Sequence, residues 1–237
     1  MTLLRVEKVT KRFGGINANE AISFEFDPGK IIGLIGPNGA GKTTLFNCIA
    51  GSASPTSGQI WLGDRNITGL PPEQCAQAGV ARTFQIARTF SSMSAIENVM
   101  VGGFLSDRSV SRVRSEAMKL LALVNLEPYA EKRASSMTIS EQRRLAVARA
   151  LAIRPRLLLM DEVMAGLNPT EVREMVTAVC KIRDLGISCL IVEHVLEGIM
   201  PIADSIVVLD YGKKIADGTP AQVSNDVAVI AAYLGDE

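Results

Sequence analysis

The segment GPNGAGKTT at residues 36–44 constrains this chain more than any other feature of its sequence. It fits the pattern G-x-x-x-x-G-K-[ST], follows the apolar run IIGLIG and precedes the helical pattern LFNCIAG. A strand, a glycine-rich turn and a helix in this order let backbone N–H groups wrap phosphate oxygens at the positive end of the helix. A glycine-rich turn with a surface lysine is the alternative, but the flanking elements favour a nucleotide site. The residues predicted to contact the nucleotide are Gly36, Pro37, Asn38, Gly39, Ala40, Gly41, Lys42, Thr43 and Thr44.

Polar side chains in this loop and at the end of a later strand complete the predicted site. Lys42 is expected to contact the β- and γ-phosphate oxygens, and the Thr43 hydroxyl to ligate Mg²⁺. The apolar run LLLMDE ends with Asp161 and Glu162, at the strand edge where α/β sheets bind ligands. We expect Asp161 to hold Mg²⁺, directly or through water, and Glu162 to polarise the attacking water as a general base. An acidic pair that faces solvent is the alternative.

The only histidine, His194, ends the next apolar run, SCLIVEH. Because the ends of successive parallel strands lie along one sheet edge, we expect His194 close to Glu162. There it could hydrogen-bond the γ-phosphate and hold the attacking water in line. A purely structural histidine is the alternative.

The order of the elements predicts one compact α/β unit with a helical insertion. The first thirty residues alternate apolar and polar side chains, as strands of an antiparallel sheet do, and QIWLGDRNI returns to strand before a turn at Pro71 and Pro72. Residues 95–152 are helical in pattern, with no convincing strand. RLLLMDE, SCLIVEH and SIVVLD then alternate with helical segments, which indicates parallel strands with crossover helices. YGKKIADGTP predicts a hairpin and turn, and VIAAYLGDE a short helix.

The charge balance and composition argue against several classes of function, although they do not exclude a local basic patch. Lysine plus arginine equals aspartate plus glutamate at 25 each, so no strong field selects a polyanion, and nucleic-acid binding is disfavoured. The apolar runs are too short to span a bilayer, and the N-terminal residues lack the apolar stretch of a signal peptide. The four cysteines show no C-x-x-C pairing, so we expect reduced, mostly buried thiols rather than a metal site.

Several motifs in a fixed order cover nearly the whole chain. They are the phosphate loop, Gln85 in RTFQ, a segment before QRRLAVARAL, LLLMDE and His194. In this order they resemble the ATP-binding subunits of ABC transporters. More narrowly, VTKRFGG, GPNGAGKTTLFNCIAG, GVARTFQIARTF, AGLNP and AAYLG resemble the ATPases of branched-chain amino acid importers. Related ATPases that serve urea, other amides or lipopolysaccharide share much of this pattern.

This resemblance implies a fold, two cofactors and a set of partners. The fold is an α/β phosphate-loop ATPase core with an antiparallel β subdomain, at about residues 1–85 and 153–237, and an inserted helical subdomain at about 86–152. The cofactors are ATP and Mg²⁺, with two ATP molecules sandwiched head to tail between this chain and a second ATPase subunit. The helical subdomain would dock on one of two membrane permeases, at the cytoplasmic face of the membrane, and a periplasmic or extracellular binding protein would be an indirect partner. Nucleic acid is not an expected partner.

The resemblance also assigns roles to two residues outside the core motifs. Phe13 stands where the family places an aromatic ring that stacks on adenine, although a core phenylalanine near a turn remains the alternative. Gln85 matches the residue that senses Mg²⁺ and the attacking water, in a loop that touches the membrane subunit. A surface glutamine is the alternative for Gln85.

The segment MTISE at residues 137–141, the signature segment, departs from the Leu-Ser-Gly-Gly-Gln of the family. Its pattern predicts a helix with Ser140 at the N-cap. By alignment, Thr138 keeps the hydroxyl that donates to the γ-phosphate bound by the other subunit. Ser140 replaces a glycine that approaches this phosphate closely, and Glu141 replaces a neutral glutamine and adds negative charge near it. We therefore expect a weakened contact to the nucleotide of the partner.

Two further departures leave the catalytic groups in place. Val163 follows Glu162 where the family usually has proline, so the turn after the base is less restrained. Asn168 stands where most ABC ATPases have aspartate.

The leading hypothesis from the sequence is the ATPase of an importer for branched-chain or related amino acids. In a heterodimer, the site on this chain's own phosphate loop would hydrolyse ATP, and the site served by MTISE would be slow. A regulatory nucleotide-binding module that barely hydrolyses ATP, and the ATPase of a related importer or a lipid exporter, are the alternatives. ABC proteins of translation or DNA repair are disfavoured, because they carry two cassettes or a long coiled coil.

Overall fold

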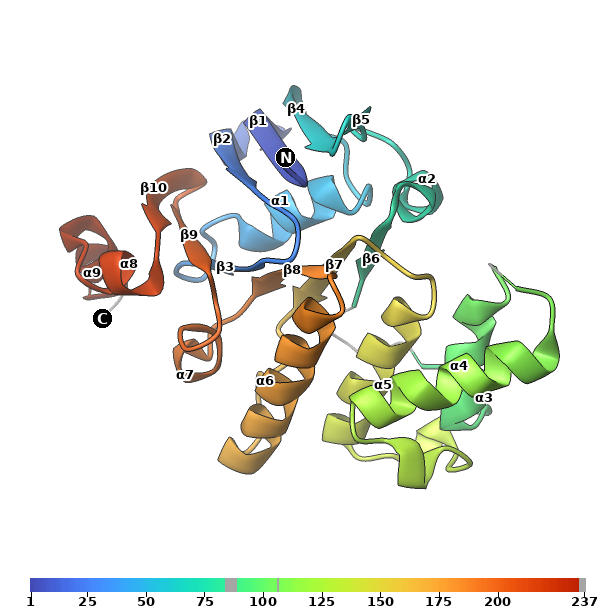
Figure 1. The fold of residues 1–237 in the computed structure, drawn as a ribbon. Helices are drawn as coiled ribbons and strands as arrows, with labels where there is room; N and C mark the ends of the chain where they lie inside the picture. Colours follow the sequence, from blue (N-terminus) through green and yellow to red (C-terminus); the bar gives the residue numbers. More distant parts are fainter. Residues whose placement is uncertain (84–88, 106, 235–237) are drawn as a thin grey trace.

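The structure, a computed structural model, describes residues 1–83, 89–105 and 107–234 (Figure 1). A small antiparallel sheet has the strand order β2-β1-β4-β5, which confirms the antiparallel arrangement predicted for the first thirty residues. Lys8 has a φ of 47° at an irregularity in the register of β1, between Val6 and Val9. The extra residue lets Val9 instead of Lys8 face the core. The strands of this sheet are β1 (Leu4–Phe13), β2 (Ile16–Phe26), β4 (Ser57–Leu62) and β5 (Arg65–Asn66).

A second sheet forms the centre of the molecule and has the order β10-β9-β3-β8-β7-β6. The pairs β9–β3, β3–β8, β8–β7 and β7–β6 are parallel, and β9 and β10 form an antiparallel hairpin. The predicted parallel strands and the C-terminal hairpin are thus confirmed, whereas β6 was not predicted. The strands are β3 (Ile31–Ile35), β6 (Val80–Arg82), β7 (Leu157–Asp161), β8 (Ser188–Val192), β9 (Ser205–Asp210) and β10 (Lys213–Gly218).

The side chains of the central strands alternate between two separate apolar clusters. Ile32 and Leu34 of β3 pack with the small sheet and α1 (Lys42–Ile49). Ile31 and Ile35 face the other cluster, which is formed with the long helices. Figure 1 shows the small sheet and α1 above the central strands, and α3 to α6 below them. Both faces of the parallel sheet are therefore covered, which explains its continuous apolar runs.

The insertion between β6 and β7 is helical, as predicted. It contains α3 (Ala95–Gly103), α4 (Val110–Leu123) and α5 (Ile139–Leu151), with short 3-10 turns at Glu127–Tyr129 and Ala134–Ser136. Helix α3 begins with a capping box, in which the Ser94 Oγ accepts from the Glu97 N–H and the Glu97 carboxylate accepts from the Ser94 N–H. None of the helices in the described ranges is long and apolar enough to cross a membrane.

The remaining helices flank the core. Helix α2 begins at the second of two adjacent prolines, where only a turn was predicted, because proline is well suited to the first position of a helix. These helices are α2 (Pro72–Ala78), α6 (Pro169–Asp184), α7 (Leu196–Ile199), α8 (Pro220–Ser224) and α9 (Val227–Leu234).

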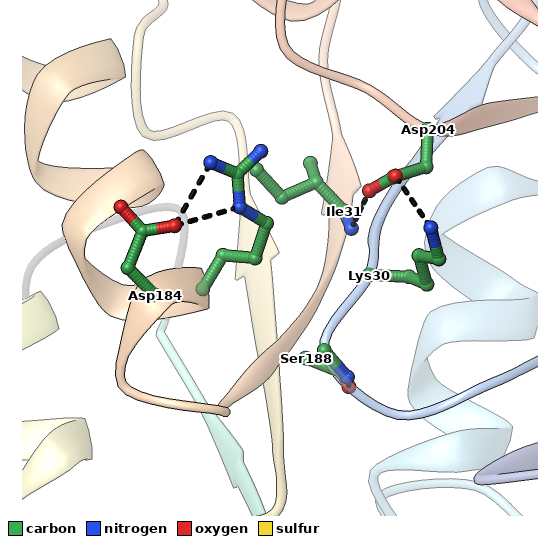
Figure 2. A network of polar contacts seen from close by, with 7 residues as sticks. Lys30, Ile31, Asp184, Ser188 and Asp204 are labelled. Carbon is green, nitrogen blue, oxygen red and sulfur yellow. Dashed lines mark hydrogen bonds and ion pairs between the residues drawn. The ribbon is translucent and has the colours of Figure 1, made fainter.

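The amino-terminal edge of the central sheet is held by side-chain hydrogen bonds (Figure 2). The Asp204 carboxylate accepts from the Ile31 N–H and from the Lys30 ammonium, each at 2.9 Å. The Ser188 hydroxyl accepts from the Gly29 N–H at 2.8 Å. These bonds join the starts of β3, β8 and β9, and they leave the opposite edge of the sheet to the loops that carry the predicted site.

Candidate active site

The phosphate loop connects β3 to α1 and lies against two other segments at close range. A Cβ on Gly36, at φ 146°, would lie 2.0 Å from the Leu209 carbonyl oxygen. A Cβ on Gly41, at φ 95°, would lie 2.2 Å from the Ala18 carbonyl oxygen. Asn19 is fully buried, and its side-chain amide donates to the Gly41 carbonyl at 3.0 Å. Only glycine therefore fits at positions 36 and 41.

The loop borders a cavity of about 220 Å³. Glu162 and His194, the predicted general base and its neighbour, also line this cavity. Lys42 is buried, and its ammonium donates to the Gly36 and Pro37 carbonyl oxygens, each at 2.7 Å. Burial lowers the pKa of Lys42, and the nearby carboxylates of Glu162 and Asp161 oppose this effect. The cavity is lined by Ala18, Asn38, Gly39, Ala40, Gly41, Lys42, Thr43, Thr44, Glu162 and His194.

Asp161 is the last residue of β7 and is almost fully buried. Its backbone N–H donates to the Thr83 hydroxyl at 3.2 Å, and its carboxylate lies 3.7 Å from the Arg82 guanidinium. Burial raises the pKa of Asp161, and the positive charge of Arg82 counteracts the rise. The contact with Thr83 ties the strand end to the segment that leads toward Gln85. Gln85 itself lies outside the described residues, so its predicted role stays a prediction.

Glu162 and His194 are brought together at the ends of adjacent strands. Glu162 has a φ of 50°, in the left-handed region that non-glycine residues rarely adopt. Its N–H donates to the Val192 carbonyl at 2.9 Å, which ties the turn to β8. The His194 Nε2 lies 3.3 Å from a Glu162 carboxylate oxygen, and both side chains line the cavity. The chain thus holds a carboxylate and an imidazole opposite the phosphate loop.

The residues predicted to hold Mg²⁺ fit this ion in chemistry. Mg²⁺ is usually held by one or two protein oxygens, and phosphate and water oxygens supply the rest. Thr43 lines the cavity and offers a hydroxyl. Asp161 offers a buried carboxylate, and one of its oxygens lies 3.7 Å from a guanidinium nitrogen of Arg82. No group of three or more His, Cys, Asp or Glu that could hold a metal ion occurs in the described part of the chain. This absence is compatible with an ion held mainly by a nucleotide.

Phe13, the predicted adenine-stacking residue, ends β1 and does not line the cavity. Its side chain is 54% exposed, and the Lys11 ammonium lies 4.9 Å from the centre of its ring. The ring is accessible for stacking, and the stacking itself stays a prediction.

The prediction that Ser140 caps α5 is wrong, because Thr138 is the N-cap. The Thr138 hydroxyl accepts from the Glu141 N–H at 3.2 Å, and the Glu141 carboxylate accepts from the Thr138 N–H at 2.8 Å. Threonine followed three residues later by glutamate is the spacing of a capping box, so MTISE keeps this device. Ser140 lies in the first turn, and its buried hydroxyl has no hydrogen-bond partner among the described residues.

The charge of Glu141 is compensated inside the chain. Glu141 is only 7% exposed, and its carboxylate accepts from the Lys132 ammonium at 2.7 Å. Burial alone would raise the pKa of Glu141, but the bonds from Lys132 and the Thr138 N–H outweigh it and lower the pKa. The expected repulsion of a phosphate by a bare Glu141 charge is therefore corrected: the carboxylate is neutralised by a cation nine residues earlier.

The exposed part of MTISE is Ile139, at 71% exposure. Figure 1 shows the start of α5 well away from the loop that precedes α1. MTISE therefore lies apart from the phosphate loop of its own chain.

Other residues that contact the predicted site or signature segment were not singled out in the sequence, among them Asn19, Thr83, Arg82 and Lys132. Asn19, Thr83 and Arg82 contact segments far apart in the chain, Lys132 contacts a residue nine positions later, and no local motif marks these contacts. Of these, Arg82 and Thr83 carry a weak signal, because they lie three and two residues before Gln85 in the segment ARTFQ.

Comparison with known proteins agrees with this geometry. The family described as "ABC transporter" matches residues 19–165, and the family described as "Branched-chain amino acid ATP-binding cassette transporter" matches residues 213–237. The chain is 40% identical to the high-affinity branched-chain amino acid transport ATP-binding protein LivG of Escherichia coli (strain K12), over 99% of this chain and 98% of LivG. It is 39% identical to BraF of Pseudomonas aeruginosa, which carries the same description, with the same coverage.

A more distant relative serves another cargo, and solved structures share the fold. The lipopolysaccharide export system ATP-binding protein LptB of Acidithiobacillus ferridurans is 33% identical over 99% of this chain and 98% of LptB. A nucleotide-free ATP-binding cassette from an ABC transporter superposes with a TM-score of 0.90 at 27% identity and covers 100% of both chains. A cassette in its ADP conformation gives the same TM-score at 28% identity. The chain therefore belongs to the ABC transporter family, as an ATP-binding and ATP-hydrolysing subunit homologous to the branched-chain amino acid transport ATPases.

Proposed function

We propose that this subunit hydrolyses ATP at its own phosphate loop and thereby switches two membrane permeases of an importer for branched-chain or related amino acids. The observation that carries the proposal is the placement of Glu162 and His194, 3.3 Å apart, on the cavity that the phosphate loop encloses.

The chemistry proposed for the site is phosphoryl transfer to water. Water attacks the γ-phosphorus, the bond to the bridging oxygen of ADP breaks, and the Glu162 carboxylate accepts the proton of the water. His194 holds the water and a γ-phosphate oxygen in line, and Lys42 stabilises negative charge on the phosphates. Mg²⁺, held through Thr43 and Asp161, would neutralise phosphate charge when bound. The remaining loop residues bind through their backbone N–H groups.

The proposed cargo rests on the relatives and on the C-terminal segment. LivG and BraF are described as branched-chain amino acid transport proteins, and the match at residues 213–237 is to a family of that description. The relative described as part of lipopolysaccharide export keeps a lipid exporter as the alternative. Cargo is selected by the permeases and by a periplasmic or extracellular binding protein, so this chain supplies the motor.

The proposed docking site for a permease lies between the core and the helical insertion. A cavity of about 230 Å³ there is lined by Arg82, Thr83, Asn98 and Arg149, among others. Two exposed apolar side chains, Phe90 and Val101, also line this cavity, and Phe104 and Leu105 at the end of α3 are exposed as well. An apolar patch around a polar hollow suits a helix end of a membrane protein. This placement supports a subunit bound to the cytoplasmic face of a membrane, with residues of about 86–152 as the docking subdomain.

The separation of this chain's own phosphate loop from MTISE in the fold (Figure 1) supports a second ATPase subunit. We propose a partner whose signature segment serves the ATP on this chain, while Thr138 and Ile139 of this chain face the partner's ATP. Ser140 and Ile139, which stand where the family has glycine, favour a slower site there. The alternative function, a regulatory module that barely hydrolyses ATP, is favoured by these two residues and opposed by the intact Glu162–His194 pair.

Substitution of the proposed base tests the function. In the complex with permeases and partner ATPase, Glu162→Gln should lower ATP turnover by about 10²-fold or more, with ATP binding retained. The matched control is Glu197→Gln, which removes an exposed carboxylate in α7 and should leave turnover unchanged. Retention of most turnover by the Glu162 variant would contradict both the role of Glu162 and the assignment of hydrolysis to this phosphate loop.

A further inference from the structure

Glu193 is a fully buried carboxyl group that the proposed chemistry does not use. It follows the last residue of β8 and directly precedes His194. Its exposed fraction is 0%. Burying a carboxyl group without full compensation is costly, so a role for this one is expected.

The carboxyl group joins the two segments that carry Glu162 and His194. One oxygen, Oε1, accepts from the Met164 N–H at 2.7 Å, two residues after Glu162. The backbone N–H groups of Val195 and His194 also interact with this carboxyl group. The other oxygen, Oε2, has no hydrogen-bond partner within the described parts of the chain. Glu193 is thus a bridge between the turn after the base and the end of the neighbouring strand.

The turn after Glu162, which Glu193 contacts, has a backbone conformation that surrounding contacts must stabilise. Glu162 adopts a left-handed φ of 50°, which persists only when surrounding contacts hold it. The next residue is Val163, which lacks the ring that fixes φ in a proline. On its far side the turn is held at the Ala165 carbonyl, which accepts from Arg143 of α5. The backbone bond from Glu162 to Val192 also ties this turn to β8, and the bond from Met164 to Glu193 adds a side-chain restraint between the turn and the segment of His194.

We propose that Glu193 is a positioning residue, whose side chain holds the turn after Glu162 at the distance from His194 that hydrolysis requires. The proposal rests on the roles proposed above for Glu162 and His194. The contact depends on the reach of the side chain and on an acceptor oxygen, and not on negative charge. In agreement, burial raises the pKa of Glu193 to about 7, with Glu162 adding to the rise and the three backbone N–H groups opposing it.

Two substitutions separate reach from charge. Glu193→Gln keeps the length of the side chain and an acceptor oxygen, and removes the charge. Glu193→Asp keeps the carboxyl group and withdraws it by one methylene from the Met164 N–H. In the complete transporter complex, the aspartate variant should lower kcat for ATP by about 10- to 100-fold, because misplacement of reacting groups by about 1 Å costs this much. The KM for ATP should stay within about twofold, and the glutamine variant should retain most of kcat.

Ser188 offers a matched control at the other end of the same strand (Figure 2). It is also fully buried, and it also accepts one backbone N–H, that of Gly29. Ser188→Ala should lower thermal stability and leave kcat unchanged. A purely structural role of Glu193 would instead make kcat follow stability in all three variants.

Each outcome decides the inference. Equal kcat in the aspartate and glutamine variants would overturn it, and so would loss of kcat in the glutamine variant alone, which would assign the role to charge. Glu162→Gln, measured beside them, tells the two proposals apart. If that variant is inactive and Glu193→Asp is fully active, only the positioning role fails, whereas an active Glu162→Gln removes the proposed function itself.

Discussion

Glu141 and Lys132 form an ion pair at the start of α5, with 2.7 Å between the ammonium nitrogen and a carboxylate oxygen. The carboxylate also accepts from the Thr138 N–H, so it serves the capping box and the ion pair together. Glutamate in place of glutamine in the signature segment adds a charge, and the Lys132 ammonium compensates this charge within the chain. The electrostatic effect of Glu141 therefore depends on Lys132, which lies outside the signature segment.

Removal of Lys132 should show how much the ion pair with Glu141 contributes to stability. Lys132→Met leaves a buried, unpaired carboxylate and should lower the free energy of unfolding by about 1–3 kcal/mol. The double variant Lys132→Met, Glu141→Gln should recover most of the loss, because glutamine can still close the capping box. Urea unfolding of the three proteins measures both effects. Equal stability of the single and double variants would show that Lys132 does not compensate Glu141.

Glu193 should make stability depend on pH. The folded protein keeps this proton up to about pH 7, whereas the unfolded chain releases it near the usual value of 4.5. Between these values the folded state binds more protons, so the free energy of unfolding should fall as pH rises, by on the order of 3 kcal/mol.

Glu193→Gln has no proton to release and should lack this component of the slope. Urea unfolding at about pH 5 and about pH 8 gives the difference between wild type and variant. The same slope in both proteins would mean that Glu193 does not hold its proton in the folded state.

Among the elements, α6 shows how the sequence defines a helix start within a functional loop. Asn168 is the N-cap, and its side-chain oxygen accepts from the Thr170 and Glu171 N–H groups, each at 3.0 Å. The Glu171 carboxylate accepts from the Asn168 N–H at the same distance, and Pro169 occupies the first helical position. These capping bonds fix the residue at which the loop after Glu162 ends and α6 begins.

Substitution of Asn168 should test this cap. Asn168→Ala should lower the free energy of unfolding by about 1 kcal/mol. Asn168→Asp should be close to wild type, since aspartate is an equally good N-cap and its charge suits the helix N-terminus. Thermal unfolding of the pair measures the cap, and an alanine variant as stable as the aspartate variant would contradict it.

Elements with strong local patterns could be predicted from the sequence, and those set by tertiary contacts could not. The parallel strands that end in Asp161 and before His194 are continuous apolar runs, and the phosphate loop is a local motif. Strand β6 has only three residues, Val80–Arg82, and it is defined by its pairing with β7. No periodicity can be read in so short a segment.

The same difference holds for the candidate site. Lys42, Thr43, Asp161, Glu162 and His194 could be proposed from the sequence because each stands in a motif or at a predicted strand end. Glu193 and Lys132 were missed because their partners lie 29 and 9 residues away. Ser140 was taken as the N-cap because serine at a helix start is a good cap. The threonine–glutamate spacing two residues earlier competes with it and prevails in the structure.

At the scale of the whole molecule, the proposed function requires two chains for one complete catalytic site. The phosphate loop and the signature segment lie on separate parts of this subunit (Figure 1), so a single chain supplies only half of each proposed site. Association, and not chemistry alone, should therefore limit the ATPase activity of the isolated protein.

Dilution should reveal this requirement. Well below the dissociation constant of the dimer, turnover per subunit should fall about tenfold for each tenfold dilution. In the complex with permeases the dependence should largely disappear, because the membrane subunits raise the effective concentration of one ATPase at the other. Specific activity that is constant on dilution of the isolated protein would contradict a shared site.

The hydrogen bonds at the amino-terminal edge of the central sheet should make this edge more rigid than the opposite edge. Asp204 and Ser188 hold the starts of three strands together, whereas the other edge ends in turns with left-handed backbone at Glu162 and in the phosphate loop. We expect the strands to keep their relative positions during the proposed closure around a nucleotide. Under the proposed function, closure around a nucleotide would displace the turns and the attached helices, and would act on a permease from the side of α3, α4 and α5.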